Sequence, residues 1–325
     1  MAIRLGASLS MLVAALPLMS ARPPLSSIIV EPEIASVRET PAPGEATPNC
    51  TLSAGWAEVE RRKPRYVVFG ELHGTEESPA FVGNLACALA VKGERLLVAV
   101  EHNAEYDAAF QAAWRLPPAQ FTAELQKAGW AGRNDGVASK AMLQMLVRLH
   151  ALKQRGRSIN IVAFNGARDD AQRARLSDLP GQGPHEAAQA ENIRTAANAR
   201  PYDRVLILVG NIHARKLPVD FRGVQFKPMV MQLAPAETIV ALNMRTADGS
   251  SWGCRLKQGL TPEKGKPLPQ GAITCGPYPM KEQLDLHQAP FVALGDFPQE
   301  KSDGNYDGFF WLGTVHASAP AVPAP

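Results

Sequence analysis

Four short apolar runs of this sequence each end in polar residues that could do chemistry. Glu71 and His73 follow the first run, Glu101 follows the second, and His213 follows the fourth. Brought together, two carboxylates and two imidazoles have two sensible uses. A histidine or a glutamate can act as a general base on water while another group stabilises the developing charge. Alternatively, the same side chains can hold a divalent metal that activates water.

The elements that must position these residues are buried strands. The runs Tyr66–Phe69, Leu96–Val100, Ile159–Phe164 and Val205–Val209 are continuously apolar, which is typical of parallel strands covered on both faces by helices. The carboxyl ends of parallel strands lie along one edge of a sheet, so residues distant in sequence should converge there. We therefore expect an α/β fold with a mainly parallel sheet, helices on both faces and the site at the strand ends.

The spacing Gly-x-x-His occurs twice at these ends, as Gly70 to His73 and as Gly210 to His213. Glycine lets the chain turn sharply as it leaves the sheet, so that the histidine can point back across the strand tops. Glu101, expected on the strand adjoining that of His73, would be costly to bury without a partner. These four residues, Glu71, His73, Glu101 and His213, are the catalytic candidates.

Each candidate also has a purely structural interpretation. Glu71 could stabilise a helix N-terminus, and His73 could be a turn histidine bonded to backbone. His102 should point away from Glu101 because side chains alternate along a strand. Asn165 and Asn211 are interpreted as residues that shape loops or hydrogen-bond to the site from outside it.

The sequence lacks the motifs that define several classes of enzyme. The sequence has no Gly-x-Ser-x-Gly elbow, no Walker loop, no Gly-x-Gly-x-x-Gly and no His-Glu-x-x-His. The formal net charge is +3 and no Lys/Arg-dense block is present, so a nucleic-acid partner is not supported. A small-molecule ligand is the expected partner.

The N-terminus predicts export. Residues 1–21 have the charged start, apolar centre and small-residue end of a signal peptide, and the apolar part is too short for a stable membrane span. Residues 22–48 are interpreted as a Pro-rich linker, 49–316 as one α/β domain and 317–325 as a disordered tail. Within the domain, residues 223–316 should be β-rich, with antiparallel strands added to the sheet. We expect a periplasmic or secreted protein.

The four cysteines fit an oxidising compartment, where an even number suggests disulfides. They allow three pairings. We favour Cys50–Cys87 and Cys254–Cys275, because each pair lies within one region of the chain.

In these residues and their order, the sequence resembles the erythromycin esterase/ChaN-like superfamily, which includes the TIKI and TraB proteins. Five separated pieces carry the resemblance in the right order, and the C-terminal run Tyr306–Gly313 favours the ChaN-like branch. The pieces are Val68–Gly74, Val98–His102, Ile161–Phe164, Ala190–Ile193 and Leu208–Ala214.

The resemblance implies three different activities. The esterase branch implies hydrolysis by water activated at His73 and Glu101, with Glu71 as helper. The TIKI branch implies a metal-dependent protease, with Glu71, His73 and His213 as metal ligands. The ChaN branch implies haem binding, with a homodimer that encloses two haems. There the candidate contacts are His73, Asn211, His213 and His185, which stands where an arginine is expected.

We therefore expect an exported ChaN-like protein whose polar pocket binds haem, iron or another metal ion. Two alternatives stay open at this point. One is a water-activating hydrolase of esters or peptides, with or without a metal. The other is a non-catalytic ligand-binding module that keeps the pocket of the superfamily.

Overall fold

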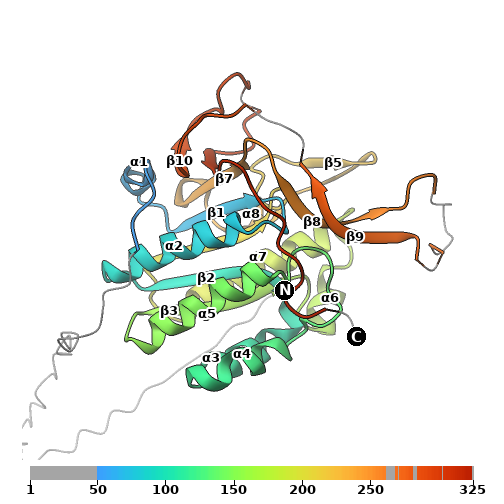
Figure 1. The fold of residues 1–325 in the computed structure, drawn as a ribbon. Helices are drawn as coiled ribbons and strands as arrows, with labels where there is room; N and C mark the ends of the chain where they lie inside the picture. The colour runs from blue at the N-terminus through green and yellow to red at the C-terminus, as the bar shows by residue number, and fades with distance from the viewer. Residues whose placement is uncertain (1–49, 261–267, 270, 281–283, 302, 324–325) are drawn as a thin grey trace, which may run out of the picture. The chain divides into compact units, whose positions relative to one another are not determined.

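A seven-stranded, mostly parallel sheet forms the centre of this computed structural model, with strand order β10-β11-β7-β1-β4-β2-β3 (Figure 1). The structure describes residues 50–260, 268–269, 271–280, 284–301 and 303–323. The expected signal peptide and the expected linker both lie outside these residues. The strands are β1 (Tyr66–Glu71), β2 (Leu96–Asn103), β3 (Ile159–Asn165), β4 (Arg204–Gly210), β7 (Ile239–Arg245), β10 (Phe291–Leu294) and β11 (Gly308–Trp311).

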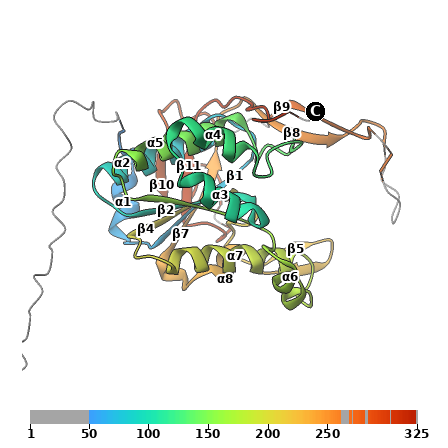
Figure 2. The ribbon, with the colours of Figure 1, turned by 90° about the horizontal axis from the view of Figure 1, so that it is seen from below.

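Helices cover both faces of this sheet, as the apolar runs predict (Figure 2). Successive residues of a strand point to opposite faces of the sheet, and each face has its own hydrophobic core. In β1, Val67 and Phe69 pack toward α2 and α5, whereas Tyr66 and Val68 pack toward α7 and α8. The helices are α1 (Trp56–Arg61), α2 (Glu77–Val91), α3 (Asp107–Trp114), α4 (Pro118–Gln126), α5 (Lys140–Gln154), α6 (Asp170–Leu176), α7 (Gly183–Asn198) and α8 (Met229–Leu233), with the 3-10 turns η1 (Ala104–Tyr106) and η2 (Ala236–Thr238).

Antiparallel pairs are added in the C-terminal third, as expected. They are β5 (Val219–Phe221) with β6 (Val224–Phe226), β8 (Ser250–Leu256) with β9 (Ile273–Pro279), and β10 with β11. However, β7 does not add to the sheet edge, because it pairs parallel with β1 inside the sheet. The region 223–316, expected to be β-rich, also contains helix α8, which begins directly after Pro228.

Covalent and C-terminal contacts fasten the domain. Both favoured disulfides, Cys50–Cys87 and Cys254–Cys275, are formed. Residues 317–323 do not form the free tail that their composition suggested. Ser318 and Ala321 donate backbone hydrogen bonds to Gly74 and Ala138, while Lys140 donates one to Ala319. None of the helices in the described part of the chain combines the length and apolar character that a membrane crossing requires.

Candidate functional site

The ends of three neighbouring strands bring the four catalytic candidates together. The parallel strand β4 pairs with β1 on one side and with β2 on the other. The prediction that Glu101 adjoins the strand of His73 is therefore wrong in detail, because β4 lies between them. This order places the Gly210–His213 turn between Glu71 and Glu101, so both histidines can reach the same carboxylate.

Glu101 lies at the centre of the cluster. Its Oε2 accepts a hydrogen bond from the backbone N–H of Gly210 at 2.6 Å and lies 3.3 Å from Nε2 of His73. Its Oε1 lies 3.5 Å from Nε2 of His213. The residue is only 5% exposed, so the two imidazoles and the peptide N–H supply the partners that a buried carboxylate needs.

Glu71 orients His73. Its Oε1 lies 2.8 Å from Nδ1 of His73, and Glu71 is the last residue of β1. The Glu71 carbonyl also accepts a hydrogen bond from the backbone N–H of Asn211 at 2.9 Å, which ties the two Gly-x-x-His turns to each other. A carboxylate on Nδ1 fixes the ring so that Nε2 faces Glu101.

Glu186 does the same for His213, and sequence reasoning missed it. Its Oε1 lies 2.7 Å from Nδ1 of His213, while its Oε2 accepts the backbone N–H of Met229 at 2.8 Å. The residue is fully buried in the first turn of α7. An acid in that turn is ordinary helix chemistry, so its position after Pro184-His185 gave no signal that it would face a histidine.

The cluster is a chain of alternating charges. Its order is Glu71, His73, Glu101, His213, Glu186, with Glu101 shared by two histidines that each have their own carboxylate. Gly70 and Gly210 allow the close packing beneath it. A Cβ at Gly70 would lie 2.7 Å from the Cβ of Ala214, and one at Gly210 would lie 3.0 Å from Nε2 of His73.

These contacts set the protonation states. Burial acts to lower the pKa of His73, but the charges and hydrogen bonds of Glu101 and Glu71 outweigh it and hold that pKa well above the ordinary value. Burial acts to raise the pKa of Glu101, yet His73, His213 and the Gly210 N–H bring it to about 2. Burial lowers the pKa of His213, while Glu186 and Glu101 raise it to a net value above the ordinary one. Glu101 is therefore an anion beside a protonated His73 near neutral pH.

The remaining candidates lie around this cluster. The His185 ring lies 5.6 Å from the His213 ring, and its Nε2 is 2.9 Å from the amide nitrogen of Gln189, which also donates to Asn165. Burial and the charge of His213 lower the pKa of His185, so it is neutral. Asn211 contributes to the cluster through its backbone N–H, which donates to the Glu71 carbonyl.

His102 points away from Glu101, as strand alternation predicts. It packs among the rings of Tyr106, Phe110 and Trp130 on the opposite side of β2. Burial, followed by the charge of Arg133, lowers the pKa of His102 to about 3. This histidine belongs to the core.

The predicted metal ligands are not arranged as a coordination sphere. Glu71 bonds Nδ1 of His73, whereas the Nε2 atoms of both histidines face Glu101. Across the described ranges, no group of three or more His, Cys, Asp or Glu side chains is placed to hold a metal ion.

Comparisons with known proteins give the fold. No protein-family model and no curated protein matches the chain. A succinoglycan biosynthesis protein matches with a TM-score of 0.54 and 10% identity, over 81% of this chain and 91% of that one. A mutant of erythromycin esterase EreC in its open conformation matches with a TM-score of 0.51 and 12% identity, over 78% and 91%.

The haem-binding ChaN of Campylobacter jejuni gives a TM-score of 0.34 and 15% identity, over 57% of this chain and 84% of its own, which is too slight a likeness to support an inference. At these identities a likeness extends to the fold alone. The resemblance inferred from the sequence is thus confirmed for the fold, which this chain shares with erythromycin esterase.

Proposed function

We propose that this protein is a hydrolase in which Glu101 activates water and His73 acts as the acid. The observation that carries the proposal is the Glu101 carboxylate, which is buried, held by the N–H of Gly210 and placed between two imidazoles. Such groups, with their pKa values displaced in opposite directions, make an acid and base pair.

The protonation states assign the roles. Glu101 keeps its charge down to low pH, so it is in the proton-accepting form throughout the neutral range. His73 is protonated and can give its Nε2 proton to the leaving group or to an oxygen that gains charge. Glu71 and Glu186 hold the two rings in place, and His213 places a second positive charge beside Glu101. The substrate class that this chemistry serves is an ester or a peptide.

Export is part of the proposal. Disulfides persist in oxidising compartments, and Cys50–Cys87 fastens the start of the domain to α2. Together with the signal-like residues 1–21, this supports a periplasmic or secreted location.

The experiment is a hydrolysis assay on the exported form of the chain, with p-nitrophenyl acetate, a lactone and a fluorogenic peptide as probes. Glu101→Gln and His73→Ala should each lower kcat/KM on the accepted probe by about 10²–10⁴-fold. Glu191→Gln is the control, because Glu191 lies on the same helix as Glu186 but pairs with Arg175 and Arg168 at the surface. Undiminished hydrolysis in both site variants would overturn the proposal.

A wild-type protein that cleaves none of the probes would favour the ligand-binding alternatives. Adding hemin and following its absorbance then separates them. Saturable binding that His73→Ala and His213→Ala abolish would replace hydrolysis with haem binding, and a chelator-sensitive activity would add a metal to the hydrolase.

A further inference from the structure

The edge of the sheet where the parallel strands begin is rich in positive charge. Strands β1, β4, β2 and β3 are neighbours in the sheet, and each follows a short segment that contains lysine or arginine. These segments, 62–65, 199–203, 92–95 and 155–158, hold eight basic residues against two acidic ones. We call the eight the basic band. They are Arg62, Lys63, Arg65, Lys92, Arg95, Arg155, Arg157 and Arg200.

Backbone hydrogen bonds hold the four segments side by side. The N–H of Leu96 donates to the carbonyl of Ser158 at 2.8 Å, and that of Asp203 donates to the carbonyl of Arg95 at 2.9 Å. Strand β4 likewise donates an N–H to the carbonyl of Arg65 at 2.8 Å. Neighbouring strands lie about 4.8 Å apart, so the basic band extends over roughly 14 Å.

Most of the basic band lacks an acidic partner. Both acids of the segments are already used, because Asp203 pairs with Arg95 and Glu94 pairs with Arg204 of β4. Arg62 is paired with an aspartate outside the band. All the remaining cations except the half-buried Arg157 are exposed. Those without an ion pair to an acid in the described part of the chain are Lys63, Arg65, Lys92, Arg155, Arg157 and Arg200.

Helix ends account for only part of this charge. Helices α2, α5 and α7 end at the same edge, and Lys92 and Arg155 directly follow α2 and α5. The carboxyl end of a helix carries roughly half a negative charge, so three ends offset about 1.5 of the six positive charges. The exposed Glu60 of α1, next to Lys63, offsets one more. A surplus of about three positive charges is left over.

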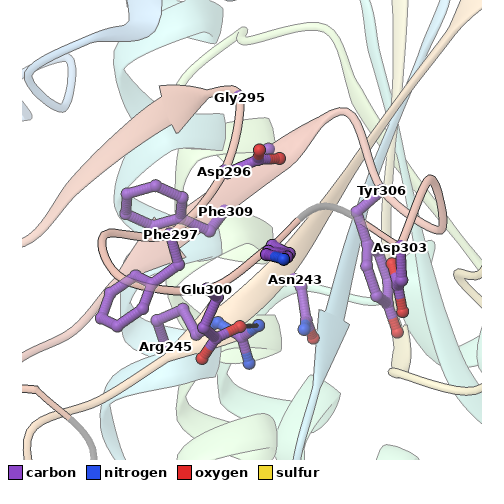
Figure 3. A pocket seen from close by; sticks show the side chains of 11 residues that line it. Asn243, Arg245, Gly295, Asp296, Phe297, Glu300, Asp303, Tyr306 and Phe309 are labelled. Carbon is purple, nitrogen blue, oxygen red and sulfur yellow. Dashed lines mark hydrogen bonds and ion pairs between the residues drawn. The ribbon is translucent and has the colours of Figure 1, made fainter.

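The basic band is not the wall of a pocket. The hollow at the end of β7 is lined by other charged residues, with acids in the majority (Figure 3). These are Asp296, Glu300, Asp303, Arg245 and Lys301. None of the large hydrophobic side chains that are exposed in the described chain lies in the four segments either. Cations spread over four strands cannot converge on one small anion, so they fit an extended surface that carries many negative charges.

We propose that the basic band is an interaction surface for a bilayer that contains anionic phospholipid. Headgroup phosphates attract each lysine or arginine that comes within a Debye length of the bilayer. Because no exposed apolar side chain accompanies the cations, the contact is electrostatic adsorption without insertion. Given the export proposed above, the extended anion that the protein meets is phospholipid and not nucleic acid.

Adsorption at this edge leaves the catalytic candidates open to solution. The Glu71–Glu186 cluster lies at the carboxyl ends of the same strands, and β1 has six residues. Six residues of strand span about 20 Å, which is more than twice the Debye length at physiological salt. The surface therefore works independently of the hydrolysis proposed above.

The test is co-sedimentation of the exported form of the chain with phosphatidylcholine vesicles that contain or lack phosphatidylglycerol. The wild type should sediment only with the anionic vesicles, and high salt should release it through screening. The triple variant Lys92→Gln, Arg155→Gln, Arg200→Gln should adsorb about a hundredfold more weakly, since each cation near the bilayer contributes about fivefold.

The matched control is the triple variant Lys140→Gln, Arg222→Gln, Lys227→Gln. It removes the same charge from exposed positions outside the basic band, so it should adsorb as the wild type does. The double variant Lys63→Gln, Arg157→Gln removes one cation at each end of the band and should weaken adsorption by about 25-fold, even if the first triple variant folds poorly.

Sedimentation does not require catalysis, so a failed hydrolase assay leaves this test intact. Four results would overturn the proposal. They are wild-type protein that ignores phosphatidylglycerol, band variants that adsorb as the wild type does, a control triple that loses adsorption equally, and tighter binding to a DNA duplex than to the anionic vesicles.

Discussion

The backbone N–H of Gly210 donates a hydrogen bond to Oε2 of Glu101 over 2.6 Å, across 109 residues of sequence. This bond joins the end of β4 to the end of β2 and fixes the carboxylate where the two imidazoles can reach it. A group held by rigid strands needs little reorganisation when charge moves, which is what an acid and base pair requires.

Replacing Glu71 by Gln should move the alkaline limb of the pH–rate profile to lower pH. Glu71 is one of the two carboxylates that raise the pKa of His73. Without its charge His73 loses its proton at a lower pH, so the acid of the reaction is lost earlier. NMR titration of the His73 ring checks the shift directly. Glu77→Gln is the matched control, since Glu77 pairs with His316 at the surface. If the alkaline limb of the profile does not move, Glu71 does not influence the pKa of the group that acts as the acid.

The stability difference between wild type and Glu101→Gln should be largest between pH 4.5 and 6.5. The pKa of Glu101 falls from an ordinary 4.5 to about 2, so its contribution is fully present above 4.5 and is lost as the pH falls toward 2. The pKa of His73 is raised above 6.5, so its contribution is present below 6.5 and is lost as the pH rises through the folded value. Urea unfolding at several pH values measures this difference. If the stability difference between the two proteins does not change with pH, the ion pairs of Glu101 do not contribute as proposed.

The sequence alone predicts where this cluster lies better than it predicts which of its residues contact each other. Continuous apolar runs ending in Glu71, Glu101 and His213 place three residues at one edge of a parallel sheet, because strand direction is implied by burial on both faces. The apolar runs do not determine the order of the strands in the sheet. The position of β4 between β1 and β2 depends on long-range packing, so the sequence does not predict which imidazole contacts which carboxylate.

Glu186 shows the same limit from the other side. It stands in a first helical turn, where acids are common, and only the approach of α7 to the Gly210–His213 turn gives it a partner. Its role therefore has no local sequence signal.

Glu186→Gln should lower activity and stability together. The carboxylate bonds Nδ1 of His213 and the N–H of Met229, and it has no contact with solvent. An amide can satisfy one of these groups but cannot stabilise a protonated His213, so we expect a loss of about 1–3 kcal/mol in the free energy of unfolding. Thermal unfolding and kcat/KM are the measurements.

The control for this prediction is Glu191→Gln on the same helix. Exposed ion pairs such as those of Glu191 contribute about 0–1 kcal/mol, so this variant should stay near the wild type. Equal effects of the two variants would mean that Glu186 acts only as a general helix residue.

Replacing His102 by Leu should make the protein more resistant to acid. The pKa of His102 falls from 6.5 to about 3, because of burial and then the charge of Arg133. The unfolded chain binds this proton at a pH where the folded chain does not, so the wild type loses stability as the pH falls from 6.5 toward 3. The variant lacks that loss, and its stability relative to wild type should rise steadily over the same interval. Acid unfolding followed by circular dichroism measures it, with the exposed His287→Asn as control.

Gly210→Ala should disable the cluster while leaving the fold in place. The added Cβ would lie 3.0 Å from Nε2 of His73, so that ring must shift by a few tenths of an ångström, whereas the 3.5 Å distance to Oε2 of Glu101 is an ordinary contact. Overpacking of this kind costs about 1–3 kcal/mol, whereas the loss of the acid and base geometry should cost activity far more. Gly276→Ala, on β9 with no atom within 4 Å of the new Cβ, should change neither quantity. The comparison of kcat/KM with thermal stability in the two variants decides it, and full activity in Gly210→Ala would show that His73 and Glu101 need not meet for the reaction.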